Sequence, residues 1–158
     1  MESEKQLHDS FDYLKNSGVD VINHWKKLTE ENIGRGEVFE VVCKIGDEYE
    51  LIRTEIPSVI ICKAKGGYPI AFFHNHPTEY RYRFQKEPAM SYGDIGWGIS
   101  NKVPCMCVGA DTDRGSDIKC FCYDLSEEEE KMLTNDLLIS DNFKDAIDKK
   151  NPYKQVHT

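Results

Sequence analysis

Residues 68–77 read YPIAFFHNHP, a short and mostly apolar run that ends in two histidines and a proline. Because the run follows a Gly-Gly turn, we expect it to form a buried β-strand. His74 and His76 are two positions apart, so on a strand their side chains point to the same face of the sheet. Pro77 has no N–H to donate to a neighbouring strand and should end the strand just after the histidines. The two imidazoles should therefore converge at one end of a sheet.

Strand-like segments surround this run on both sides. They are rich in β-branched and aromatic residues or in apolar residues, and turn residues separate them. In chain order they are EVFEVVCKI (37–45), YELIRTEI (49–56), the further apolar run PSVIICK (57–63), VPCMCVGA (103–110) and DIKCFCYD (117–124).

Helical patterns occupy the two ends of the chain and one central segment. Apolar spacing and capping residues predict helices at 4–16, 20–28, 91–101, 127–138 after the Ser126/Glu129 capping box, and from about 141 to just before Pro152. Helices that flank a mostly antiparallel sheet indicate an α+β fold or an α-β-α sandwich. We expect one domain over 1–158, with N-terminal helices (1–31), the sheet and site (37–123) and C-terminal helices (126–150).

Composition narrows the class of protein. The chain has 158 residues, 39% of them hydrophobic, and a net charge of −8, which suits one globular domain. No apolar run reaches the roughly 18 residues of a membrane span, so we expect no membrane partner. The N-terminus MESEKQLHDS is polar and unlike a secretory signal. We therefore expect a cytoplasmic protein.

One basic and aromatic stretch, YRYRFQK at 80–86, lies in the polar loop 78–90 after the histidines. Loops beside a site often carry specificity, so this stretch is either a substrate-recognition insertion or an ordinary solvated loop. Arginine and aromatic side chains also bind single-stranded nucleic acid. The net negative charge argues against that partner, because phosphate binding needs a basic surface.

Six cysteines are present, and in a cytoplasmic chain reduced thiols are the expected state. Cys105, Cys107, Cys120 and Cys122 lie on two strands that should pair, so four thiolates could bind a structural zinc. Zinc ribbons usually use Cys-x-x-Cys rather than Cys-x-Cys, and cysteine is common in buried cores. Reduced cysteines packed in the core are therefore the preferred interpretation.

The histidine pair is either a polar patch at the end of the sheet or, together with Pro77, the Ser-x-x-Asp pattern and an upstream glutamate, part of a catalytic metal centre. Catalytic zinc takes three protein ligands and leaves one position for water. Asp94, in SYGD at 91–94, could supply the third ligand, with Asp111 and Asp113 as weaker substitutes. A carboxylate general base is also needed near the water. Glu37 at the start of a strand is the first choice, and Glu40 and Glu31 are its rivals.

The pattern His-x-His-Pro, then Ser-x-x-Asp, with a glutamate upstream, resembles the JAMM motif of JAB/MPN metalloproteases. The HNHP form and the Glu-Val-Phe strand start also resemble RadC-type members, and the similarity covers residues 37–123. The resemblance implies a single MPN-like (cytidine-deaminase-like) sandwich that binds Zn²⁺. By position, the family's zinc ligands and catalytic groups fall on His74, His76, Asp94, Glu37 and Ser91.

The same resemblance implies an activity. Glu37 would be the general base and acid, Ser91 would stabilise the oxyanion, and the enzyme would be a metallopeptidase or isopeptidase. Its substrate would be a protein or peptide, typically with a ubiquitin-like tail. The loop at 78–90 is longer than is usual in the family, and we interpret the excess as an insertion. The alternatives are a non-catalytic MPN/RadC-like interaction module and a nucleic-acid-processing protein.

Overall fold

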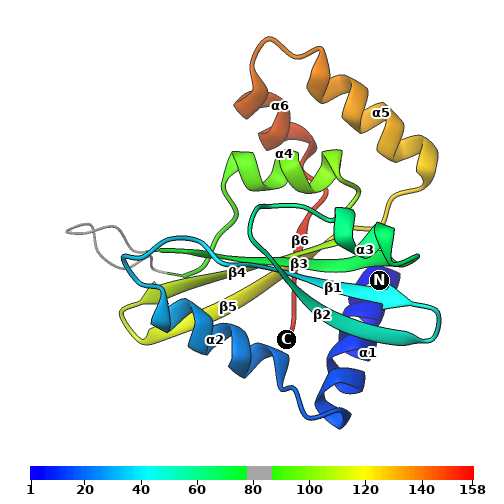
Figure 1. Cartoon of the computed structure of the whole chain (residues 1–158). Helices are drawn as coiled ribbons and strands as arrows, with labels where there is room; N and C mark the ends of the chain where they lie inside the picture. Colours follow the sequence, from blue (N-terminus) through cyan, green and yellow to red (C-terminus); the bar gives the residue numbers. More distant parts are fainter. Residues whose placement is uncertain (78–86) are drawn as a thin grey trace.

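The computed structural model describes residues 1–77 and 87–158 (Figure 1). In these residues a six-stranded mixed sheet has the order β2-β1-β3-β4-β5-β6. The parallel pair is β3 with β4, and the other neighbours are antiparallel. The strands are β1 (Phe39–Ile45), β2 (Glu48–Thr54), β3 (Tyr68–His76), β4 (Cys105–Thr112), β5 (Gly115–Cys122) and β6 (Lys154–Val156).

Helices cover both faces of the sheet, so the α+β prediction and the mostly antiparallel sheet are confirmed. Figure 1 shows two N-terminal helices on one face and the remaining helices on the other. The first group is α1 (Glu2–Asn16) and α2 (Val21–Glu31). The second group is α3 (Ile60–Ala64), α4 (Tyr92–Ser100), α5 (Glu127–Leu138) and α6 (Phe143–Lys150).

The pleat of the sheet divides the core into two halves. Phe72 of β3 packs with residues of α3, α4, α5 and α6, whereas Phe73 packs with α1 and α2. Trp25 of α2 is fully buried and stacks on Phe73, with ring centroids 4.8 Å apart and planes 5° apart. Successive side chains of β3 thus enter different halves of the core, as strand geometry requires.

Two elements differ from the predictions. The apolar run at 57–63 forms the short helix α3 instead of a strand, and Ser58 Oγ accepts a hydrogen bond from the Ile60 amide at its start. Short apolar runs do not distinguish a strand from a helix by period alone. The three-residue strand β6, which pairs with β5, was not predicted. The stretch 80–86 lies outside the described residues, so its predicted role is untested.

The prediction of reduced cysteines is wrong, and so is the alternative of a four-thiolate zinc site. All six cysteines form disulfides, in the pairs Cys43–Cys62, Cys105–Cys122 and Cys107–Cys120. The last two pairs cross from β4 to β5, where the antiparallel register sets the partners directly opposite each other. Register brings their Cα atoms to 4.1 Å.

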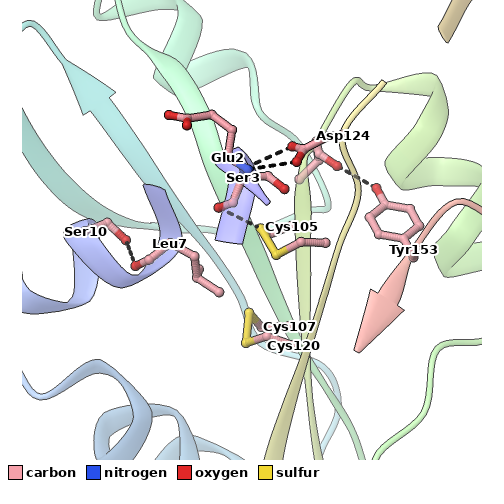
Figure 2. The surroundings of a disulfide bond; sticks show 11 residues. Glu2, Ser3, Leu7, Ser10, Cys105, Cys107, Cys120, Asp124 and Tyr153 are labelled. Carbon is pink, nitrogen blue, oxygen red and sulfur yellow. Dashed lines mark hydrogen bonds between the residues drawn. A yellow bond between two sulfur atoms is a disulfide. The ribbon is translucent and has the colours of Figure 1, made fainter. Parts of the chain in front are cut away.

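The start of helix α1 lies beside Cys105, whose Sγ is 3.5 Å from the Ser3 carbonyl oxygen (Figure 2). The segment that follows β5 fixes the first turn of α1. The Asp124 carboxylate accepts hydrogen bonds from the Glu2 and Ser3 amides at 2.8 and 3.0 Å. Such contacts satisfy amides that a helix N-terminus leaves without partners. No helix in the described part of the chain has the length and apolar character needed to cross a bilayer.

The disulfides predict the chemical state of the purified protein. Alkylation of unfolded protein should label no cysteine without reductant and six cysteines after reduction, as intact-mass spectrometry would show. Reduction should also lower the free energy of unfolding by about 2–4 kcal/mol per bond, because the unfolded chain gains freedom. Six labelled cysteines before reduction would contradict the pairing.

Candidate metal centre

Strand β3 and helix α4 bring three potential ligands together. His74 and His76 project from the same face of β3, on the side that α4 covers, and Asp94 lies in the first turn of α4. The His74 side chain is 4% exposed, and those of His76 and Asp94 are 19% and 18% exposed. One ligand atom of each residue lies within 4.8 Å of the others. The predicted ligand set is therefore assembled at one place in the fold.

The Ser-x-x-Asp motif is a capping box that aims the carboxylate. Ser91 is the N-cap of α4, and its Oγ accepts a hydrogen bond from the Asp94 amide at 3.1 Å. In return, Asp94 Oδ2 accepts one from the Ser91 amide at 2.9 Å. Reciprocal bonds of this kind fix both the helix start and the side chain at its third position. The helix cap thus determines where Asp94 presents its oxygens.

The three ligand groups form a tight triangle. His74 Nε2 lies 3.0 Å from His76 Nε2 and 3.1 Å from Asp94 Oδ1, and His76 Nε2 lies 3.0 Å from Asp94 Oδ2. Hydrogen bonds cannot satisfy all three contacts, because protons on both Nε2 atoms would set two N–H groups against each other. A cation in the middle satisfies all three groups at once.

Zinc fits this donor set. Tetrahedral zinc with bonds of about 2.0–2.1 Å needs ligand atoms about 3.3 Å apart, close to the 3.0–3.1 Å separations found here. Two imidazoles and a carboxylate also leave a fourth position for water. His74 would bind through Nε2, because this is the ring nitrogen that faces His76 and Asp94.

The carboxylate of Asp94 is strongly biased toward its charged form. Partial burial acts to raise its pKa, but hydrogen bonds with His74 and His76 and the Ser91 amide outweigh burial. Together they hold the pKa of Asp94 well below its usual range. The group therefore remains an anionic oxygen donor throughout the neutral range, as a metal ligand must be.

A pocket of about 210 Å³ opens beside the ligands. Exposed Glu37, in the loop before β1, lines this pocket together with His74 and Asp94. The remaining wall is mainly apolar and consists of Phe39, Pro57, Phe72, Gly93, Trp97 and Met106. A carboxylate, two metal ligands and an apolar surface thus share one cavity, which suits the binding of an organic group next to a cation.

The rival carboxylates lie elsewhere. Glu40 is buried on the α2 face of the sheet, where its oxygens bond to His24, Trp25 and Arg53. Glu31 is on α2 and lies 3.9 Å from Lys27.

The substitute ligands are also distant from the triangle. Asp111 is two positions from Gly109 on β4, so both point to the same face of the sheet, the one covered by α2. Partial burial and the charge of Glu30 raise the pKa of Asp111. Asp113 is exposed in the β4–β5 turn, 3.9 Å from Arg114. Neither joins His74 and His76 in the described group.

One residue of the site was missed by the sequence reasoning. Asn75, between the two histidines, is fully buried and contacts the main chain on both sides of Glu37. The only local feature that marks Asn75 in the sequence is its place between the two histidines. That position does not indicate which segment its side chain contacts.

No protein-family model matches this sequence, and no curated protein matches it. The resemblance to JAB/MPN proteins therefore depends on the motif residues alone.

The triangle predicts metal binding. Purified protein should contain about one zinc per chain, and His74→Ala or Asp94→Ala should abolish binding because two ligands hold the ion poorly. Asp111→Asn is the matched control and should retain zinc. Metal analysis by mass spectrometry measures all four proteins, and zinc that survives both ligand substitutions would exclude this site.

The capping box predicts a second, finer effect. Ser91→Ala should lower the free energy of unfolding by about 1 kcal/mol and weaken zinc binding about 10- to 100-fold, because Asp94 loses its support. Ser126 caps α5 with the same reciprocal bonds but supports no ligand. Ser126→Ala should therefore cost similar stability in denaturant titrations and leave zinc affinity unchanged. Equal zinc affinities for the two variants would contradict the role of the cap.

Proposed function

We propose that this protein is a zinc-dependent amide hydrolase of the JAB/MPN type, a metallopeptidase or isopeptidase. One observation carries the proposal: the ligand atoms of His74, His76 and Asp94 lie 3.0–3.1 Å apart, and Glu37 lines the adjacent pocket together with His74 and Asp94. Three potential ligands with an adjacent carboxylate are the parts that metal-assisted hydrolysis requires.

The arrangement of the elements supports an MPN-like (cytidine-deaminase-like) sandwich. Helices cover both faces of a mixed sheet, and the ligands lie on the central strand β3 and the adjacent helix α4 (Figure 1). The motif that resembles the JAMM signature is thus located where strand and helix meet, with its ligands on one face. This is the geometry that the motif needs in order to act as a single centre.

The chemistry proposed for each residue follows the resemblance to the JAMM motif. A bound zinc ion would act as a Lewis acid and make water nucleophilic at neutral pH. Glu37 would accept the proton of the attacking water and pass it to the leaving amine. Ser91 Oγ accepts the Asp94 amide hydrogen bond, which leaves its hydroxyl proton to donate to the developing oxyanion. His74, His76 and Asp94 would hold the ion beside the pocket.

The proposed substrate is a protein or peptide, with a ubiquitin-like tail joined to lysine as the first class to test. The apolar wall formed by Phe39, Phe72, Trp97 and Met106 suits an aliphatic group beside the scissile amide, such as the stem of a lysine. Nucleic acid is not part of the proposal, because the chain carries a net charge of −8.

The alternative function and the cellular location are separate questions from the catalytic mechanism. A non-catalytic MPN/RadC-like interaction module is the alternative, and it needs neither zinc nor Glu37. A cytoplasmic location remains the proposal from the sequence, although three disulfides are more typical of oxidising compartments. The thiol count of protein isolated from its own source would decide the location question.

Hydrolysis should depend on Glu37 and on zinc. With a fluorogenic peptide ending in Gly-Gly joined to the ε-amine of lysine, Glu37→Gln should lower kcat by about 10²- to 10⁴-fold while zinc content stays the same. Glu31→Gln, an exposed glutamate on the opposite side of the sheet, should leave kcat unchanged. Removal of zinc with a chelator should abolish turnover, and added zinc should restore it.

Two results would overturn the proposal. Full activity in Glu37→Gln would remove the general base, and iron in place of zinc would indicate oxygen chemistry, because two histidines and a carboxylate also bind Fe(II). A zinc-free and inactive wild type would favour the interaction module.

A further inference from the structure

Asn75 occupies an unusual place relative to the candidate site. It lies between the two histidine ligands on β3, but strand alternation turns its side chain to the opposite face, where it is 0% exposed. There it reaches the loop before β1. Its Oδ1 accepts a hydrogen bond from the Val38 amide at 2.6 Å, and its Nδ2 donates one to the Gly36 carbonyl at 3.0 Å.

These two bonds continue the sheet beyond its last backbone pair. The β1–β3 register ends at Phe39 and His74, so Val38 and Gly36 lie past the ladder. The primary amide of Asn75 takes the place of a peptide group there, with one acceptor and one donor. Its orientation is determined, because a flipped amide would set N–H against N–H and oxygen against oxygen.

The residue between the two bonded positions is Glu37. Among the described residues, no hydrogen bond or ion pair holds the Glu37 carboxylate itself, so its position depends on its main chain. That main chain is gripped on both sides, at Gly36 and at Val38. Gly36 also has φ +136°, a backbone conformation that favours glycine.

We propose that Asn75 is a positioning residue that holds Glu37 at the rim of the metal pocket. The catalytic meaning of this inference rests on the proposed function. The same strand thus serves the site from both faces: His74 and His76 supply metal ligands on one face, and Asn75 anchors the general base from the other. A buried amide suits this task, because its two bonds fix the loop without adding a charge.

The inference makes a direct prediction about the Val38 amide. Although Val38 lies outside β1, its amide should exchange slowly with solvent in the wild type. Asn75→Ala should speed its exchange by at least about tenfold, while the Val41 and Val42 amides inside β1 stay protected. Hydrogen exchange followed by NMR measures these sites individually. Rapid exchange of the Val38 amide in the wild type would overturn the inference without any variant.

Activity separates positioning from a general structural role. On the Gly-Gly–lysine isopeptide, Asn75→Ala should lower kcat about 10- to 100-fold, because small misplacements of a catalytic group are costly. Zinc content should not change. In a Glu37→Gln background, Asn75→Ala should cost nothing further, since the group that it positions is already disabled.

A matched control tests whether loss of any buried hydrogen bond has the same effect. Thr29→Val deletes the bond from the Thr29 hydroxyl to the Trp25 carbonyl, on the same buried face. This variant should leave kcat and Val38 exchange unchanged.

Equal activity losses for Asn75→Ala with and without Glu37 would overturn the inference. If the wild type binds zinc but cleaves no probe, the proposed function fails, and Val38 exchange alone decides whether Asn75 holds the loop.

Discussion

The central strand β3 is confined on all sides, and the rest of the structure depends on that confinement. It pairs with β1 on one edge and β4 on the other, and helices cover both of its faces. A strand in this position cannot slip by one residue without exchanging the side chains of its two faces. Phe72, His74 and His76 are therefore held on one face, and Phe73 and Asn75 on the other.

Helix α4 completes the site through its first turn. Because Ser91 and Asp94 cap each other, the carboxylate cannot rotate freely, and it meets both imidazoles at 3.0–3.1 Å. The site thus combines a rigid strand with a rigid helix terminus, which is the kind of support that a catalytic metal centre needs. Glu37 differs from these ligands, because it lies on a loop and its carboxylate depends on its backbone for placement.

Much of the site could be predicted because its signals are local. The spacing of His74 and His76 depends only on strand alternation, and the Ser91-x-x-Asp94 pattern is a helix start at any place in a fold. Local sequence distinguishes Glu37 from Glu40 only weakly, since both lie near one strand start. The fold separates them physically: Glu40 faces α2 and binds His24, Trp25 and Arg53, whereas Glu37 lines the metal pocket.

The sequence by itself determined the class of fold, most helices and strands, and the three residues of the His74–His76–Asp94 group, because periodicity, caps and short motifs are properties of neighbouring residues. Only the tertiary structure decided the features that join distant segments. The cysteines became three disulfides because the β4–β5 register and the packing of α3 bring them together. Asn75 reaches Val38 across 37 positions of the chain, a contact that exists only because β1 and β3 pair, and no local pattern encodes which strands will pair.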